Sequence, residues 1–351
     1  MVEKRKKCIG IIFGGNSNEH YVSISSAKTV FKALTSKTNK ERFTVKAFYI
    51  NKHGVWFEND QSLKILREET LQKYQVLPKR KINFLDKIEL QEIDIWFPLL
   101  HGLNGEDGAI HGLLKFTQKP LVGCGILGSA LGMDKILMKN IFSNLNIPQV
   151  NYLSFENHDL NDANVKNNLT VEIIKKLKFP IFVKPANSGS SIGISKVNNK
   201  SEIIKALQKA WKIDSRIVIE EGLEVRELEC GIIGNLKLIT SEIGEVSYSK
   251  DWYDFESKYS MVNKITIPAD INYQISEQIK DLAIRSCRAL NIYGFARVDF
   301  FLEKFSDKIF LNEINTIPGF TSNSMFPMLW NKSGLNIDQL VAKLIDISSD
   351  L

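Results

Sequence analysis

The sequence has no long apolar run. No stretch reaches the roughly 18 to 20 apolar residues that a membrane-spanning helix needs. The basic opening MVEKRKK leads into only six apolar or glycine residues, Cys8 to Phe13, which is shorter than the apolar region of most secretory signals and predicts a strand. We therefore expect no membrane partner.

Cysteine is scarce as well. The four thiols, Cys8, Cys124, Cys230 and Cys287, lie far apart, with no C-x-x-C pair and no histidine at zinc-ligand spacing. This pattern argues against structural zinc and against a disulfide framework. It predicts reduced thiols in a cytoplasmic protein.

Clustered positive charge is also missing. The 46 Lys and Arg exceed the 40 Asp and Glu, for a net charge of +6. However, the only dense basic cluster is Lys4 to Lys7, and nucleic-acid binding needs a basic stripe or patch. We expect no nucleic-acid partner, whereas a positive field suits an anionic small molecule.

The chain of 351 residues, 44% hydrophobic and 25% charged, has the composition of a folded protein with two or three domains. In its first third, apolar runs alternate with a helical stretch at 23–34, which predicts an α/β fold with a parallel sheet. The strands expected there are 8–13, 43–50, 93–100 and 120–125. A boundary is expected near Gly132.

The rest of the chain predicts two further units. A helix over 134–145 ends before Ile147-Pro148, because the residue before proline avoids the helical region. The second unit then has strands at 179–185 and 216–221 around a helix at 200–211. The third has a strand at 228–235, a helix at 272–290, and an antiparallel pair at 296–302 and 308–314.

A glycine and serine segment follows the strand that ends at Lys184. Small residues at Gly189, Ser190, Ser191 and Gly193 allow backbone N–H groups to fold over a polyphosphate while the lysine meets its oxygens. The P-loop signature G-K-[ST] is absent. The alternative for such a segment is a simple linker.

The two final strands carry polar side chains in apolar surroundings. Arg297 and Asp299 are two apart on one strand, and Glu313 and Asn315 are two apart on the next, so each pair shares a face. Carboxylate and amide oxygens suit magnesium bound to a nucleotide. The alternative is an ion pair between strands on the surface.

Two loops hold further candidates. The turn GGNSNEH lacks the G-x-G-x-x-G spacing of a dinucleotide site, and its Glu19 either faces a ligand or is a charge that favours a helix N-terminus. The loop LLHGLNGEDG carries His101, which either lies near a substrate or is a satisfied structural histidine.

In chain order, the motifs LHGLNGEDG, MDK, VKPANSGSSIG, YDFESKY, ARVDFF and NEINTIPGFTS resemble those of the D-alanine–D-alanine ligases of the ATP-grasp superfamily. The resemblance covers nearly the whole chain. It implies a three-domain ATP-grasp architecture, with an N-terminal parallel-sheet domain that binds substrate (1–132), a central ATP-grasp subdomain (133–227) and a C-terminal catalytic domain (228–351).

The resemblance also implies which residues bind ATP and metal. The ATP phosphates would meet Lys135, Lys184 and Lys258. The adenine would be bordered by Glu220, Glu221 and Leu223, and the ribose held by Glu227. Two Mg²⁺ ions, with Mn²⁺ as an alternative, would be bound by Asp299, Glu313 and Asn315.

The remaining implied roles concern the amino acids. Glu19 would hold the amino group of the first D-alanine, in a hydrogen-bonded chain with Ser190 and Tyr259. Arg297 and the Gly319 backbone would stabilise the oxyanion. The second D-alanine would meet Ser324 and Met325, with His101 near the substrate. Tyr21 stands where the family usually has a second glutamate, a departure that leaves Glu19 intact.

The activity implied is ATP-dependent ligation of two D-alanine molecules through D-alanyl phosphate, for peptidoglycan precursors, by a cytoplasmic homodimer. One alternative is a non-catalytic, nucleotide-regulated binding protein. Another is a ligase that makes D-alanyl-D-lactate or D-alanyl-D-serine. Such ligases commonly have arginine after the serine that corresponds to Ser324, where this chain has Met325.

Replacing Tyr259 with phenylalanine tests the hydrogen-bonded chain. Loss of the hydroxyl leaves its partners short of a hydrogen bond at a cost of roughly 1 to 3 kcal/mol, which loosens closure over the acceptor. We expect the share of depsipeptide to rise at lower pH, because the D-alanine amine must be deprotonated to attack and D-lactate offers a hydroxyl. Product ratios from equimolar acceptors across a pH series measure this, and an unchanged ratio contradicts it.

Overall fold

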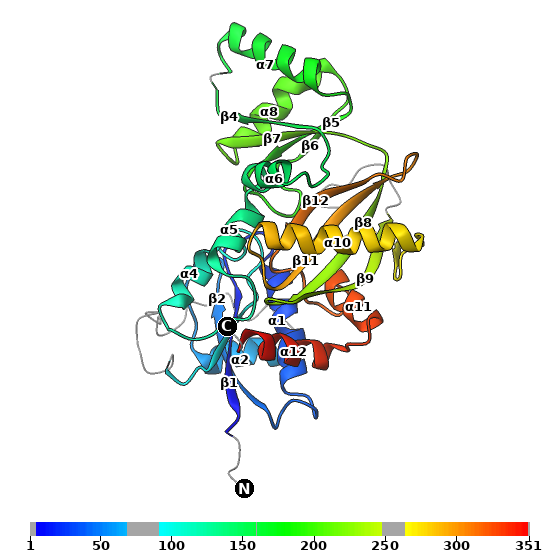
Figure 1. Ribbon diagram of the computed structural model, residues 1–351. Coiled ribbons are helices and arrows are strands. Elements are labelled where there is room, and N and C mark those ends of the chain that lie inside the picture. The colour runs from blue at the N-terminus through cyan, green and yellow to red at the C-terminus, as the bar shows by residue number, and fades with distance from the viewer. Residues whose placement is uncertain (1–4, 69–90, 159, 248–263, 350–351) are drawn as a thin grey trace.

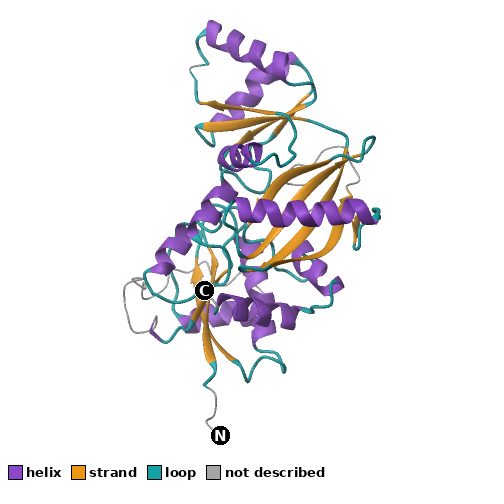
Figure 2. Cartoon of the chain, viewed as in Figure 1, coloured by secondary structure: helices purple, strands orange, loops and turns teal. Residues whose placement is uncertain are grey.

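The computed structural model describes residues 5–68, 91–158, 160–247 and 264–349 (Figure 1). The described residues form three sheets, each with helices packed beside it (Figure 2). The fold is α/β, as the alternation of strands and helices predicted.

The first sheet is parallel and has the order β2-β1-β3. Its strands are β1 (Lys7–Gly14), β2 (Phe43–Ile50) and β3 (Ile95–Pro98). Ile9, Ile11, Ile12 and Phe13 of β1 are fully buried, as expected for a parallel strand covered on both faces. The accompanying helices are α1 (His20–Leu34), α2 (Asn59–Arg67), α4 (Ala109–Lys115) and α5 (Ile126–Met133).

The prediction of a strand over 120–125 is wrong. This segment makes only an isolated bridge between Leu121 and Trp96. Pro120 has no N–H to donate to a ladder, and Gly123 adopts a φ of 125°, which turns the chain out of the extended conformation.

The second sheet has the order β4-β7-β5-β6, with antiparallel neighbours throughout. Its strands are β4 (Tyr152–Glu156), β5 (Ile181–Pro185), β6 (Ser195–Val197) and β7 (Arg216–Glu221). A short 3-10 helix, η1 (Lys200–Glu202), leads into α8 (Ile203–Trp211). Helix α7 (Ala163–Lys176) was not predicted from the sequence; it buries Leu169 and Ile173 in the core that the second sheet shares with α8.

The third sheet has the order β10-β9-β8-β11-β12. Its strands are β8 (Val225–Gly234), β9 (Leu238–Ser247), β10 (Lys264–Thr266), β11 (Gly294–Glu303) and β12 (Ile309–Asn315). The predicted antiparallel pairing of the last two strands is confirmed. Helix α10 (Tyr273–Ala289) packs on this sheet, and α6 (Lys135–Asn144) adds Met138 and Phe142 to the same core.

The C-terminal helices return to the first sheet. Helices α11 (Met325–Lys332) and α12 (Ile337–Ser348) share a core with β1, so that Phe326 and Leu344 are buried together with Ile11. Phe97 of β3 lies edge to face with Phe320, at 6.2 Å between ring centres, in a geometry that aromatic pairs prefer. This packing fixes the segment 316–320 beside the first sheet.

Candidate active site

A row of three carboxylates crosses the third sheet. Asp299 of β11 pairs with Glu229 of β8 on one side and with Glu313 of β12 on the other. Directly opposed residues share a face of a sheet. Two positions along, Arg297 lies opposite Asn315, so the structure brings together the four polar side chains that the sequence singled out.

Arg297 is held tightly in this row. Its guanidinium donates to both Asp299 carboxylate oxygens at 2.7 Å and forms an ion pair with Glu229 at 2.7 Å. Burial alone would lower the pKa of Arg297, but the facing carboxylates, Asp299 foremost, raise it well above its usual range. Glu229 was not predicted as a site residue, although this carboxylate between apolar Leu228 and Cys230 gives the same signal that revealed Asp299.

The donor set of Asp299, Glu313 and Asn315 fits a hard divalent cation in its chemistry. Mg²⁺ prefers carboxylate and amide oxygens, supplemented by phosphate and water. The Asn315 amide donates to Asp299 Oδ2 at 3.0 Å, which ties the two side chains together. No cluster of three His, Cys, Asp or Glu suited to a metal occurs among the described residues, so the candidate site depends on the Asn315 amide as its third group.

Lys135 connects this row to the glycine and serine loop. Its ammonium donates to the Ser188 carbonyl at 2.8 Å and lies 3.6 Å from the Glu313 carboxylate. Its backbone N–H donates to the Ala186 carbonyl at 3.1 Å. The start of α6 is thereby joined both to the second sheet and to the candidate metal-binding residues of the third.

Glu220 lies between two lysines. Its Oε1 is 2.9 Å from the Lys139 ammonium, and its Oε2 accepts from Lys184 at 2.5 Å. Burial alone would raise the pKa of Glu220, but Lys139 and Lys184 outweigh it and lower the pKa to about 2. Lys139 was not predicted as a site residue, although it follows Lys135 by four residues and so lies on the same face of α6.

The residues predicted at the adenine and ribose lie where the second sheet passes into the third. Strand β7 ends at Glu221, and β8 begins at Val225. The Glu221 carboxylate accepts from the Asn151 amide at 2.9 Å, Leu223 is half-buried, and Glu227 pairs with Phe301 across the third sheet. Their predicted contacts with nucleotide remain predictions.

The glycine and serine loop folds back on itself and reaches the N-terminus of α1, beside the first sheet. Ser190 and Ser191 have φ values of 50° and 58°, and Gly193 has 78°, so three residues within four adopt the left-handed region. The Ser190 hydroxyl donates to the Glu19 carboxylate. Glu19 stands at the N-cap of α1 but makes no capping hydrogen bond with its side chain, so its carboxylate faces the loop.

His101 is buried, and both of its ring nitrogens have hydrogen-bond partners. Its Nε2 lies 2.9 Å from the Ser26 hydroxyl, and its Nδ1 lies 3.0 Å from the Ile317 carbonyl. Burial alone would lower the pKa of His101, but Glu106, 3.6 Å away, outweighs it and raises the pKa. Ser26 also accepts from the Phe320 N–H at 3.0 Å. The histidine therefore holds the segment 317–320, and its predicted contact with substrate remains a prediction.

Gly319 and Ser324 lie side by side. A Cβ placed on Gly319 would come within 2.9 Å of the Ser324 hydroxyl, which itself accepts from the Thr321 N–H at 3.1 Å. The Met325 side chain is buried against Gly244 of β9. Tyr259 and Lys258 fall outside the described residues.

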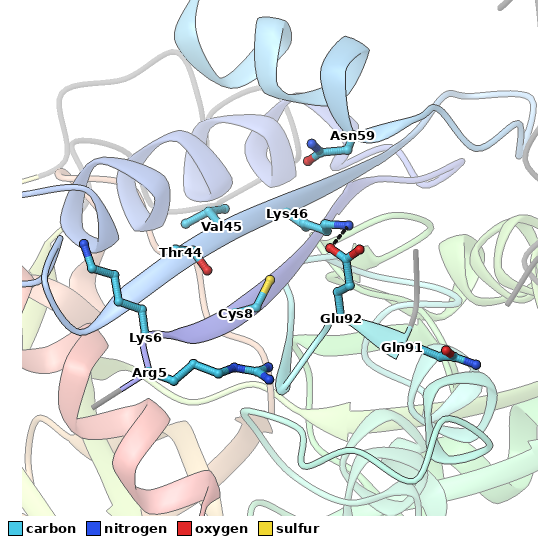
Figure 3. Close-up of a pocket in the computed structure, with 9 residues that line it drawn as sticks. All are labelled: Arg5, Lys6, Cys8, Thr44, Val45, Lys46, Asn59, Gln91 and Glu92. Atoms are coloured by element: carbon cyan, nitrogen blue, oxygen red, sulfur yellow. Dashed lines mark ion pairs between the residues drawn. The ribbon is translucent and has the colours of Figure 1, made fainter. Parts of the chain in front are cut away.

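One hollow of about 590 Å³ lies elsewhere, beside the first strands of the N-terminal sheet (Figure 3). Its three basic lining residues already have carboxylate partners: Arg5 pairs with Asp94 at 3.0 Å, Lys6 with Glu41 at 3.1 Å and Lys46 with Glu92 at 2.6 Å. None of the predicted site residues lines it.

The fold and the site define an ATP-grasp ligase. A family model described as D-ala D-ala ligase N-terminus matches residues 8–124, and one described as D-ala D-ala ligase C-terminus matches residues 141–346. The chain belongs to the D-alanine–D-alanine ligase family.

Named relatives agree with this family. D-alanine--D-alanine ligases of two Prochlorococcus marinus strains, CCMP1986 and MIT 9515, are 81% and 80% identical over the whole of both chains. Two solved structures are also similar. The VanG D-Ala:D-Ser ligase of Enterococcus faecalis has a TM-score of 0.82 at 32% identity, covering 98% of this chain and all of that one. The D-alanine-D-alanine ligase of Coxiella burnetii has a TM-score of 0.80 at 29% identity, covering 98% and 94%.

His111 of α4 predicts a pH dependence of stability. It is buried, and neither ring nitrogen has a hydrogen-bond partner among the described residues. Burial lowers the pKa of His111 to about 4. In the unfolded state the His111 ring binds a proton below about pH 6.5, whereas in the folded state it stays neutral until about pH 4. We therefore expect the free energy of unfolding to fall by about 3 kcal/mol as the pH falls from 6.5 towards 4.

Urea unfolding at pH 7.5, 6 and 5 measures this loss. His111→Leu should reduce the dependence on pH, whereas the matched change at exposed His53 should leave it as in the wild type. Equal slopes for the wild type and His111→Leu would contradict the prediction.

Proposed function

We propose that this protein joins two D-alanine molecules into D-alanyl-D-alanine, with ATP converted to ADP and phosphate. The observation that carries the proposal is the meeting of three parts of the chain at one place. Glu19 beside the first sheet contacts Ser190 in the loop of the second, while Lys135 lies between that loop and Glu313 of the third.

In the first step the carboxylate of one D-alanine attacks the γ-phosphorus of ATP, giving D-alanyl phosphate and ADP. This step needs charge neutralisation rather than a protein nucleophile, and Lys135 and Lys184 supply positive charge. When bound by Asp299, Glu313 and Asn315, two Mg²⁺ ions, with Mn²⁺ as an alternative, supply further neutralisation of the phosphates. The Glu19 carboxylate, fixed by Ser190, holds the amino group of this D-alanine.

In the second step the amine of the other D-alanine attacks the acyl carbon, and phosphate leaves. Arg297 and the Gly319 N–H stabilise the tetrahedral oxyanion. Ser324 binds the acceptor carboxylate, and Met325 borders its methyl group. Water must be kept out, because it would hydrolyse the acyl phosphate, and the segment with Lys258 and Tyr259 is assigned this role.

The proposal extends to the setting of the reaction. The product serves peptidoglycan precursor synthesis, and the enzyme acts as a homodimer in the cytoplasm. The three domains are assigned to 1–132, 133–227 and 228–351. None of the described helices is long and apolar enough to cross a membrane.

The second candidate is a ligase with a different acceptor, since the VanG D-Ala:D-Ser ligase is a structural neighbour. The higher identity to chains named D-alanine--D-alanine ligase favours D-alanine. Mass analysis of the products formed with ATP, magnesium and equimolar D-alanine, D-serine and D-lactate separates the candidates. We expect D-alanyl-D-alanine to dominate; D-alanyl-D-serine as the main product would overturn the acceptor assignment, and no product with ATP would overturn the ligase.

Glu313→Gln tests the candidate metal site. The amide keeps the shape of the side chain and removes a charge that would neutralise the cation. We expect ligation to fall about a hundredfold or more, by the several kcal/mol that metal stabilisation supplies. Initial rates across a magnesium series measure the loss, and near-normal ligation at saturating magnesium would refute the assignment.

A further inference from the structure

We infer that Lys139 is a positioning residue for nucleotide binding, which acts by holding the Glu220 carboxylate so that Lys184 remains available to the phosphates. The inference rests on the proposed function, in which Lys184 meets ATP.

Each oxygen of Glu220 has its own lysine. Lys139 approaches Oε1 from α6 at 2.9 Å, and Lys184 approaches Oε2 from β5 at 2.5 Å. Glu220 is 3% exposed and Lys139 is 1% exposed, whereas the Lys184 side chain is 12% exposed. Lys139 is therefore the enclosed partner of Glu220, and Lys184 is the more accessible one.

The balance of charge explains why two lysines are present. A buried carboxylate with one lysine forms a neutral pair, and removing either partner from such a pair is costly. Two lysines with one carboxylate carry a net charge of +1. If Lys139 were absent, Lys184 would be the only ammonium facing Glu220, and its turn towards a phosphate would leave a buried negative charge unpaired.

The Lys139 ammonium is also confined on its other side. It lies 5.2 Å from the centre of the Tyr152 ring, at a distance where a cation is attracted to the face of an aromatic ring. Lys139 is thus fixed among α6, β4 and β7, and its influence on a ligand passes through Glu220.

Lys139→Met tests the inference directly, since it keeps most of the volume and removes the charge. Calorimetric titration with ADP in the presence of Mg²⁺ should show affinity about tenfold weaker than that of the wild type. The KM for ATP should rise by a similar factor, while the KM for D-alanine changes less than about threefold. Lys139→Arg should restore ADP affinity to within about threefold of the wild type.

The matched control is Lys176→Met, which removes the exposed partner of Glu172 in a 2.8 Å ion pair on α7 and should leave ADP affinity unchanged. The decisive comparison uses Glu220→Gln as the background. There Lys184 no longer faces a carboxylate, so adding Lys139→Met should change ADP affinity less than about threefold, because coupled residues are non-additive. The double variant lacks both buried charges, so its ADP affinity can still be compared with that of Glu220→Gln if Lys139→Met alone does not fold.

The outcomes separate this inference from the function on which it rests. A tenfold loss that persists in the Glu220→Gln background would show that Lys139 acts by its own field or through the fold, and would overturn the inference. Unchanged ADP affinity in Lys139→Met would also overturn the inference. The proposed function would still stand in that case, provided that the wild-type protein ligates D-alanine. A wild-type protein that binds no ADP would refute both.

Discussion

Neutralisation of buried charge is the constraint on which the site depends. Carboxylates and cations removed from water are costly unless they face one another with good geometry. Here Glu220 faces two lysines, and Arg297 faces Asp299 and Glu229. The pairs of Glu220 join β5 and β7 of the second sheet to α6, and α6 also places Met138 and Phe142 in the core of the third sheet. Satisfying these buried charges therefore also links the two sheets. The pairing of charges in the site and the arrangement of the two sheets therefore depend on each other.

Much of the fold could be predicted because apolar periodicity reports burial locally. The parallel pairing of β1 with β2 and the antiparallel pair β11 and β12 follow from such runs. Helix α7 escaped prediction because its polar sequence, ANVKNNLTVEIIKK, buries only a few side chains against the second sheet. The segment 120–125 was wrongly predicted as a strand for the opposite reason. It is apolar because it is largely buried, but the backbone conformation of Gly123 prevents an extended ladder.

For the candidate site, residues on one strand or on adjacent strands could be placed from spacing alone, as Arg297, Asp299 and Asn315 show. Contacts between distant segments could not, because spacing carries no information about which sheets meet. Glu229 carried a local signal, as a carboxylate among apolar residues, and Lys139 shares a face of α6 with Lys135, but their partners, 68 and 81 residues further along the chain, could not be predicted from spacing. The Glu19 and Ser190 contact was expected only because the family resemblance implied it.

The return of the C-terminal helices to the first sheet bears on how the chain is made. The core around Ile11 includes Phe326 and Leu344, so β1 leaves the ribosome long before the residues that cover its apolar surface have been made. Domains generally complete their folding during synthesis only when all their parts have emerged. A ribosome that stalls before α12 would release a chain with an open, aggregation-prone first sheet, even though the central segment with β4 to β7 and its own core is already complete.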